Sequence, residues 1–150
     1  MGNSNSIVSS ISLKEVSIIS EEELEIIQNN LVYNFKISLI SKNRTKNIKI
    51  TISFLSNKSF EVFEKFFIPN KGLKNDNNVE QNYHKLISLI KDERLQIQHE
   101  SNNFEKYILF TFENNEMENV KLFPSLMNEK DKANILINNY RTLQKNYIEL

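Results

Sequence analysis

The residues best suited to acid-base or metal chemistry are few and scattered in this chain of 150 residues. The only histidines are His84 and His99, and no third ligand stands at a spacing that would complete a metal site. The only aspartates, Asp76, Asp92 and Asp131, fall in predicted loops or helix ends. A mechanism with two carboxylates in one cleft is therefore not supported.

Nucleotide chemistry of the common types is excluded by the shortage of glycine. Gly2 and Gly72 alone cannot form a P-loop or a dinucleotide fingerprint, which both need several glycines. The chain also lacks cysteine, so it has no thiol nucleophile, thiolate metal site or disulfide framework. We expect no enzyme, no cofactor, no bound metal and no small-molecule substrate.

The charge and the hydropathy of the sequence limit the classes of partner that the protein is expected to bind. With 19 acidic and 19 basic residues the formal charge is zero, whereas a nucleic-acid binder normally carries a basic excess, so no nucleic-acid partner is expected. No run of about 18 apolar residues is present to span a bilayer. The start, Met1 to Ser12, lacks the basic flank and apolar core of a secretory signal. The sequence predicts a cytoplasmic protein.

The first six residues match the acceptor pattern for N-myristoylation, with Gly2 after the initiator methionine and Ser6 at the favoured hydroxyl position. The competing interpretation is a disordered polar start. Lys14 is the only base among the first 20 residues, and one acyl chain without a basic patch binds a membrane weakly. Gly2 is thus a lipidation candidate, and membrane contact is expected only if it is acylated.

The elements that would position any site begin with a hairpin between Leu31 and Leu55. Apolar residues take every second position on both sides of the loop Lys42 to Thr45. This periodicity is typical of strands that have one buried face and one solvent-exposed face. The register predicted from this alternation pairs Leu39 with Ile48, Ile37 with Ile50, Phe35 with Ile52, and Tyr33 with Phe54.

The segments beside the hairpin have weaker patterns. Residues 13–19 alternate loosely and predict a short edge strand, and Ser20 with Glu23 has capping-box spacing that predicts a short helix ending near Asn29-Asn30. Residues 59–68 fit a helix or a strand, and the spacing of their phenylalanines favours a helix. Residues 79–90 have the clearest helical periodicity and are expected to cover the hairpin.

Three further strand candidates, residues 95–99, 107–112 and 120–122, are separated by asparagine pairs and predict an antiparallel meander that ends at Pro124. From Ser125 onward the chain is predicted to be helical, and its apolar residues recur three or four positions apart, as in a heptad seam. The residues of this association seam are Ala133, Leu136, Tyr140, Leu143, Tyr147 and Leu150. The alternative is that this helix packs against its own domain. Because the seam continues to the last residue, we expect that the chain is a fragment or that a partner binds its end.

These elements predict an α+β fold, with an antiparallel sheet built from the N-terminal hairpin and the C-terminal meander, helices on one face and a long C-terminal helix. The expected organisation is a flexible or loosely attached segment at 1–20, a head domain at 21–124, and an amphipathic helix with a possible short coiled coil at 125–150.

The element order resembles a small domain type of unassigned function common in protist proteins of AT-rich genomes. The matching residues run from Tyr33 to Leu122, notably 59–67, 83–87, 95–97 and 107–112. At a looser level, a β-rich head with a helical insert and a terminal coiled coil is similar to the heads of centriole cartwheel and DNA-ligase-cofactor proteins. That resemblance rests on order and spacing, and it implies dimerisation through the terminal helix and head-to-head assembly; the short seam departs from it.

The function expected from the sequence is a non-enzymatic structural or assembly subunit of a larger cytoplasmic or cytoskeletal complex, with a protein partner or a second copy bound through the C-terminal helix. The alternative is a reversibly membrane-associated, N-myristoylated adaptor.

Overall fold

A computed structural model describes residues 16–56, 59–67 and 76–148 of the chain. The strands and α-helices in chain order are β1 (Val16–Gln28), β2 (Leu31–Lys42), β3 (Thr45–Ser56), β4 (Ser59–Phe67), α2 (Asp76–Lys91), β5 (Leu95–Ser101), β6 (Lys106–Phe112), β7 (Val120–Pro124) and α3 (Glu129–Ile148). One short 3-10 turn, Glu113–Asn115, lies between β6 and β7.

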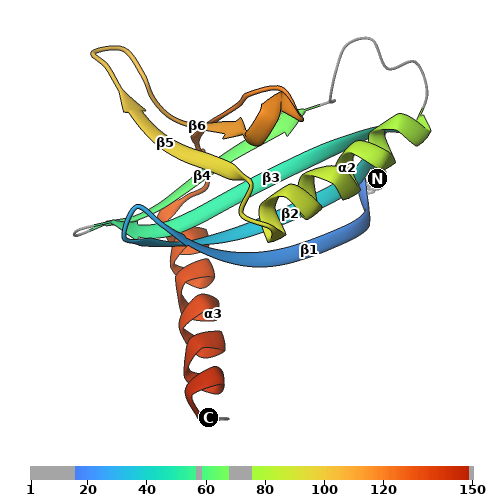
Figure 1. Cartoon of the computed structure of the whole chain (residues 1–150). Coiled ribbons are helices and arrows are strands. Elements are labelled where there is room, and N and C mark those ends of the chain that lie inside the picture. Colours follow the sequence, from blue (N-terminus) through green and yellow to red (C-terminus); the bar gives the residue numbers. More distant parts are fainter. Residues whose placement is uncertain (1–15, 57–58, 68–75, 149–150) are drawn as a thin grey trace, which may run out of the picture.

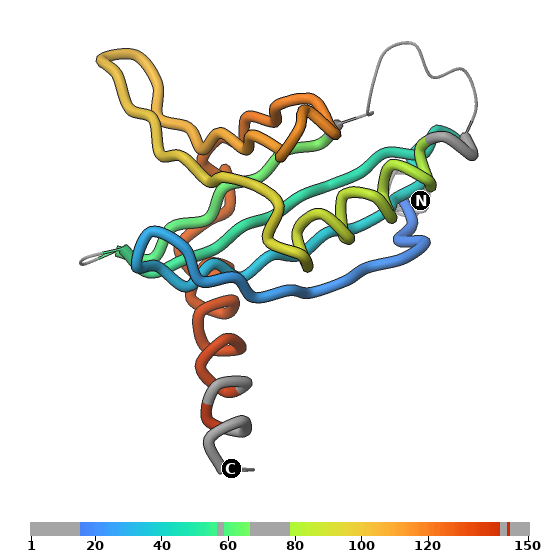
Figure 2. The backbone as a smooth tube through the Cα atoms, viewed as in Figure 1, coloured from blue at the N-terminus to red at the C-terminus, as the bar shows by residue number. Residues whose placement is uncertain are grey.

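The seven strands form one antiparallel sheet in the order β1-β2-β3-β4-β7-β6-β5. The sheet curves into a half-barrel, and α2 lies against its inner face (Figure 1). A single cluster of buried side chains joins the inner faces of β2 and β3 to those of α2, β5 and β6. The curvature brings β5 back above the hairpin, so the two ends of the sheet approach each other (Figure 2).

The predicted register of the β2–β3 hairpin is confirmed. Leu39 lies opposite Ile48, Ile37 opposite Ile50, and Phe35 opposite Ile52. All six of these side chains are 2% exposed or less. The register follows from the strict alternation, because a slip by one residue would bury the polar set instead.

The β2–β3 turn is tighter than predicted, and the predicted helix end at Asn29-Asn30 is a second hairpin turn. The predicted four-residue loop is a two-residue turn at Asn43-Arg44, and Asn29-Asn30 forms a second such turn between β1 and β2. All four turn residues have positive φ, between 52° and 64°, as a type I′ turn requires. Asparagine tolerates this left-handed region better than most residues, but arginine does not.

Replacing Arg44 by glycine is therefore expected to stabilise the protein. Glycine adopts the positive φ of 64° without a Cβ clash, so the free energy of unfolding should rise by about 0.5–1 kcal/mol. Urea denaturation measures the change. The matched control is Thr45→Gly at the adjacent extended position, which should lower the free energy of unfolding. Equal effects of both substitutions would contradict the idea that the positive φ of Arg44 is the cause.

Two segments predicted to be helical are strands. The helix expected after Ser20 is part of β1, where Leu24 and Ile26 point inward and alternate with Glu23 and Glu25. The preferred helix at 59–68 is wrong as well, because β4 pairs along β3 from Ser56 to Ile48. In both cases a long ladder of hydrogen bonds to a neighbouring strand outweighs weak local helix signals, since tertiary context commonly overrides propensity.

The predicted α+β fold class is wrong, because the described residues form a mostly antiparallel sheet with two short α-helices of 16 and 20 residues. The predicted long C-terminal helix from Ser125 is wrong too: residues 125–128 are irregular, and α3 begins at Glu129. The helices do not share a face. Asn139 of α3 contacts Ser53 on the outer side of the sheet, opposite α2 (Figure 1).

The clearest helix prediction, at residues 79–90, is confirmed by α2, whose Val79, Tyr83, Leu86, Ile87 and Ile90 are buried in the core. The three strands of the predicted meander are present as β5, β6 and β7. Within the described ranges, no helix is both long enough and apolar enough to cross a membrane.

Candidate functional site

The structure describes only part of the predicted association seam. Ala133 and Tyr140 are exposed on α3, whereas Leu136 is half-buried. Leu143 and Tyr147 lie in the helix, but their side chains, and the whole of Leu150, fall outside the described residues, as does the lipidation candidate Gly2.

The burial pattern of α3 divides the helix into two sides. Half-buried residues recur at Lys132, Ile135 and Asn139, and the Asn139 amide nitrogen lies 3.5 Å from the Ser53 hydroxyl. The exposed apolar residues are Ala133, Ile137 and Tyr140, with Ile137 47% and Tyr140 53% exposed. Their spacing of four and three residues places them along one side of the helix. We call these three residues the α3 stripe.

The start of α3 is fixed to the sheet by a chain of hydrogen bonds. The Ser125 N–H donates to the Val62 carbonyl at 2.8 Å, and the Ser125 hydroxyl accepts from the Met127 N–H at 3.1 Å. Asn128 caps the helix by accepting from the Asp131 N–H at 2.8 Å. Because the first turn is held in this way, the direction in which α3 leaves the sheet is set by the fold (Figure 1).

A second exposed apolar group lies at the tip of the β5–β6 hairpin. Phe104 is 96% exposed, and the Asn102 side chain holds the turn by accepting from the N–H groups of Phe104 and Glu105, each at 2.8 Å. An Asx turn of this kind fixes the backbone without covering the ring. Leu126, between β7 and α3, is 99% exposed. Neither residue can be identified as exposed from the sequence, because a single exposed apolar side chain leaves no periodic signal.

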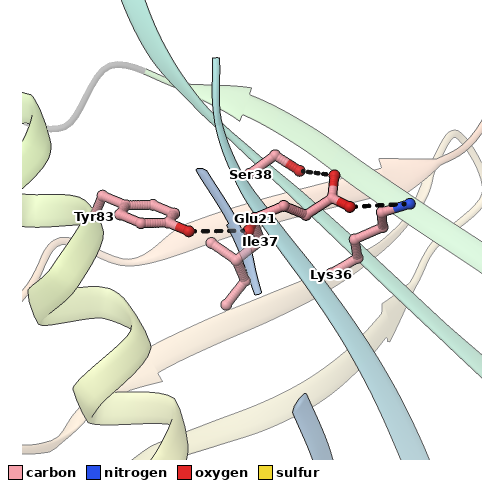
Figure 3. Close-up of polar contacts among 5 residues, drawn as sticks. All are labelled: Glu21, Lys36, Ile37, Ser38 and Tyr83. Carbon is pink, nitrogen blue, oxygen red and sulfur yellow. Dashed lines mark hydrogen bonds and ion pairs between the residues drawn. The ribbon is translucent and has the colours of Figure 1, made fainter. Parts of the chain in front are cut away.

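The outer face of the hairpin carries a polar network rather than a cleft. The Ser38 hydroxyl donates to Glu21 at 3.0 Å, and Glu21 lies 3.6 Å from the Lys36 ammonium group. On the opposite side of β2 the Tyr83 hydroxyl of α2 lies 3.5 Å from the Ile37 carbonyl, so Figure 3 shows the two faces of the strand side by side. Glu21 thus pairs with both Ser38 and Lys36, and a partly exposed ion pair of this kind adds little stability.

The main cluster of titratable and aromatic groups closes the corner between the β1–β2 turn and β5. The Tyr33 hydroxyl lies 2.6 Å from His99 Nε2, and the His99 ring packs edge-on against Phe54 with 5.1 Å between ring centroids. The Asn29 amide donates to the Ile97 carbonyl at 2.8 Å. Glu61, which pairs with Lys106, faces the same histidine.

Burial shifts the pKa of both members of the Tyr33–His99 pair in the direction that favours the neutral form. Burial raises the pKa of Tyr33, and the hydrogen bond from Asn29 opposes this effect. Partial burial lowers the pKa of His99, the charge of Glu61 raises it, and the charge of Lys106 lowers it. A neutral histidine that is unprotonated at Nε2 accepts a hydrogen bond from the Tyr33 hydroxyl, so the pair links β2 to β5.

This link predicts a pH dependence of stability. Because the pKa of His99 in the folded protein is below its ordinary value of 6.5, the unfolded chain binds more protons between these two values. The free energy of unfolding should therefore be constant above about pH 6.5–7 and fall as the pH drops below 6.5. Urea denaturation of the wild type and His99→Gln between pH 7.5 and 5 should show a shallower fall for the variant; equal slopes would contradict the assignment.

The histidines are not brought together. His84 is exposed on α2 and packs edge-on against the Tyr83 ring, whereas His99 lies on β5. In the part of the chain that the structure describes, no group of three potential ligands could hold a metal ion. Among the described residues, one surface hollow lies at the base of the β5–β6 hairpin and another beside β1, and neither of these is lined by a histidine.

Comparison of the chain with protein-family models, with curated proteins and with solved structures found no match.

Proposed function

We propose that this protein is a non-enzymatic structural or assembly subunit of a larger cytoplasmic or cytoskeletal complex, and that it associates through α3. The observation that carries the proposal is the α3 stripe, whose Ile137 and Tyr140 are about half exposed on a helix that is anchored at its start and points away from the sheet. The side of α3 that contacts the sheet already has its own apolar residues, the half-buried Ile135 and Leu136, so Ile137 and Tyr140 are additional apolar residues outside that contact.

Phe104 supports the same proposal. Its ring is almost fully exposed on a turn whose backbone is held by hydrogen bonds to the Asn102 side chain, so binding would order the Phe104 side chain but little of the backbone. Aromatic side chains presented in this way are enriched among the residues that dominate protein interfaces. The proposed subunit therefore has one contact surface on α3 and a second at the hairpin tip.

The test replaces two members of the α3 stripe by charge. Ile137→Asp with Tyr140→Asp should weaken self-association or partner binding by about tenfold or more, because burying an unpaired carboxylate in an interface is costly. Sedimentation equilibrium and pull-down with partners identified from the native cell measure the change. The control, Asn134→Asp with Gln144→Glu, adds the same charge at exposed polar positions of α3.

The control variant should retain the mass and partners of the wild type. An unchanged mass and unchanged partners for the stripe variant would refute association through α3. A stripe variant with a lower melting temperature than the control would instead show that the stripe contributes to folding of the domain itself.

The alternative function is a reversibly membrane-associated adaptor. It is favoured by the sequence observation that Gly2 and Ser6 match the myristoylation pattern. Intact-mass measurement of the protein from its native cell tests this: an acylated N-terminal glycine supports it, and an unmodified N-terminus refutes it.

A further inference from the structure

In the part of the chain that the structure describes, β1 is an edge strand of the sheet. Among the described residues it pairs only with β2, and it is 13 residues long, whereas natural proteins usually keep edge strands short or covered. The other edge, β5, is partly blocked, because Gln28 accepts from the Ile97 N–H at 2.7 Å and donates to the Leu95 carbonyl at 3.2 Å. The Asn29 side-chain amide donates a hydrogen bond to the Ile97 carbonyl, so this acceptor is also engaged. Of the two edges, β1 is the one available for pairing.

A surface hollow of about 350 Å³ lies along the second half of β1. Its lining includes four consecutive strand residues, Leu24 to Ile27, together with Lys91 and Glu93 at the end of α2. Consecutive residues of a strand point to opposite faces of a sheet, so a hollow lined by four in a row faces the strand's edge. The backbone groups on that edge are the ones that a further strand would pair with.

The charges around this hollow favour a basic occupant. Lys91 is neutralised by Glu22 at 2.6 Å, which leaves Glu25 and Glu93 as the acidic groups lining the hollow. Lys91 and Glu93 also mark the C-terminal end of α2, where the helix dipole attracts positive charge. Beside these charges, the partly buried Leu24 and the exposed Ile27 are the apolar residues of the hollow that side chains of an added strand would contact.

A second copy of β1 is a poor occupant of its own edge. The strand carries glutamate at positions 21, 22, 23 and 25, so a second copy would bring further negative charge to an edge where Glu25 and Glu93 already line the hollow, and like charges across an interface are unfavourable. We therefore propose that the β1 edge binds an extended segment of a partner protein in which basic and apolar residues alternate, by addition of a strand to the sheet. This site is separate from the α3 stripe and does not rest on the proposed assembly function.

The probe is a synthetic peptide of alternating lysine and valine, N-methylated at every second residue so that only one of its edges can form hydrogen bonds. Added to the ¹⁵N-labelled full chain, it should shift the amide resonances of residues 24–27 and slow their hydrogen exchange. The variant Glu25→Lys with Glu93→Lys should bind about tenfold more weakly, since two attractive pairs become repulsive.

The matched control is Glu100→Lys with Glu118→Lys, which changes the net charge equally at exposed positions outside the hollow. It should bind the peptide like the wild type, and equal weakening of both variants would overturn the site. Equal binding of a peptide methylated on both edges would overturn strand addition. Protection of residues 24–27 that rises with protein concentration in the absence of peptide would overturn the proposed occupant in favour of a second copy.

Discussion

Replacing Phe110 by alanine should lower the free energy of unfolding by about 3–5 kcal/mol, the range observed when a large buried aromatic is truncated. Phe110 is fully buried on β6, with its ring centroid 5.6 Å from that of Phe35 on β2 and 6.4 Å from that of Phe112. It therefore joins the meander to the hairpin across the inside of the half-barrel. Removing the ring leaves a cavity where these two parts of the sheet meet.

Urea denaturation followed by circular dichroism measures this loss. Phe104→Ala is the matched control, because it removes the same ring from the same hairpin at a site that is 96% exposed. The control should change the free energy of unfolding by no more than about 0.5 kcal/mol. Similar losses in both variants would show that the β5–β6 hairpin, and not the contact with Phe35, determines the effect of Phe110.

The parts of the fold that could be predicted are those with local periodicity. The β2–β3 register follows from strict alternation. When Ile37 lies opposite Ile50, all the apolar residues of both strands share one face, and a slip by one residue would separate them. Helix α2 follows equally well from the spacing of Val79, Tyr83 and Ile90. In each case one segment of sequence contains the whole signal.

The parts that failed depend on partners distant in the sequence. The β4 phenylalanines occur at helical spacing, and only pairing with β3 decides that Phe63 points inward while Phe66 points out. The Asn29-Asn30 pair was read as a helix end, because asparagine is common at both helix ends and type I′ turns. Because the segment after Ser20 is predicted to be a helix, the predicted sheet lacks most of β1.

The candidate site was predicted in part. The exposed positions Ala133 and Tyr140 belong to the heptad seam, whereas Leu136 of the same seam is half-buried and Ile137 takes its place in the α3 stripe. The corner around His99 could not be predicted, since Tyr33 lies 66 residues away from it in the chain. Contacts of that range follow from the curvature of the sheet, which no local pattern encodes.

The same corner supports the second large effect: Gln28→Ala should lower the free energy of unfolding by about 2 kcal/mol. The Gln28 amide acts as a short substitute for a strand, because it both accepts from the Ile97 N–H and donates to the Leu95 carbonyl. Alanine would leave two backbone groups of β5 without these partners. Hydrogen exchange at the Ile97 amide should accelerate in the variant, which locates the loss at this edge.

Two further substitutions separate the hydrogen bonds from the loss of a side chain. Gln98→Ala truncates an exposed glutamine on the same strand, β5, and should change stability by less than about 0.5 kcal/mol. Gln28→Glu keeps an acceptor for Ile97 but loses the donor to Leu95, so its stability should fall between those of the wild type and Gln28→Ala. Equal losses for Gln28→Ala and Gln98→Ala would mean that β5 is held in place by its apolar residues alone, and that the polar corner contributes nothing to closing the half-barrel.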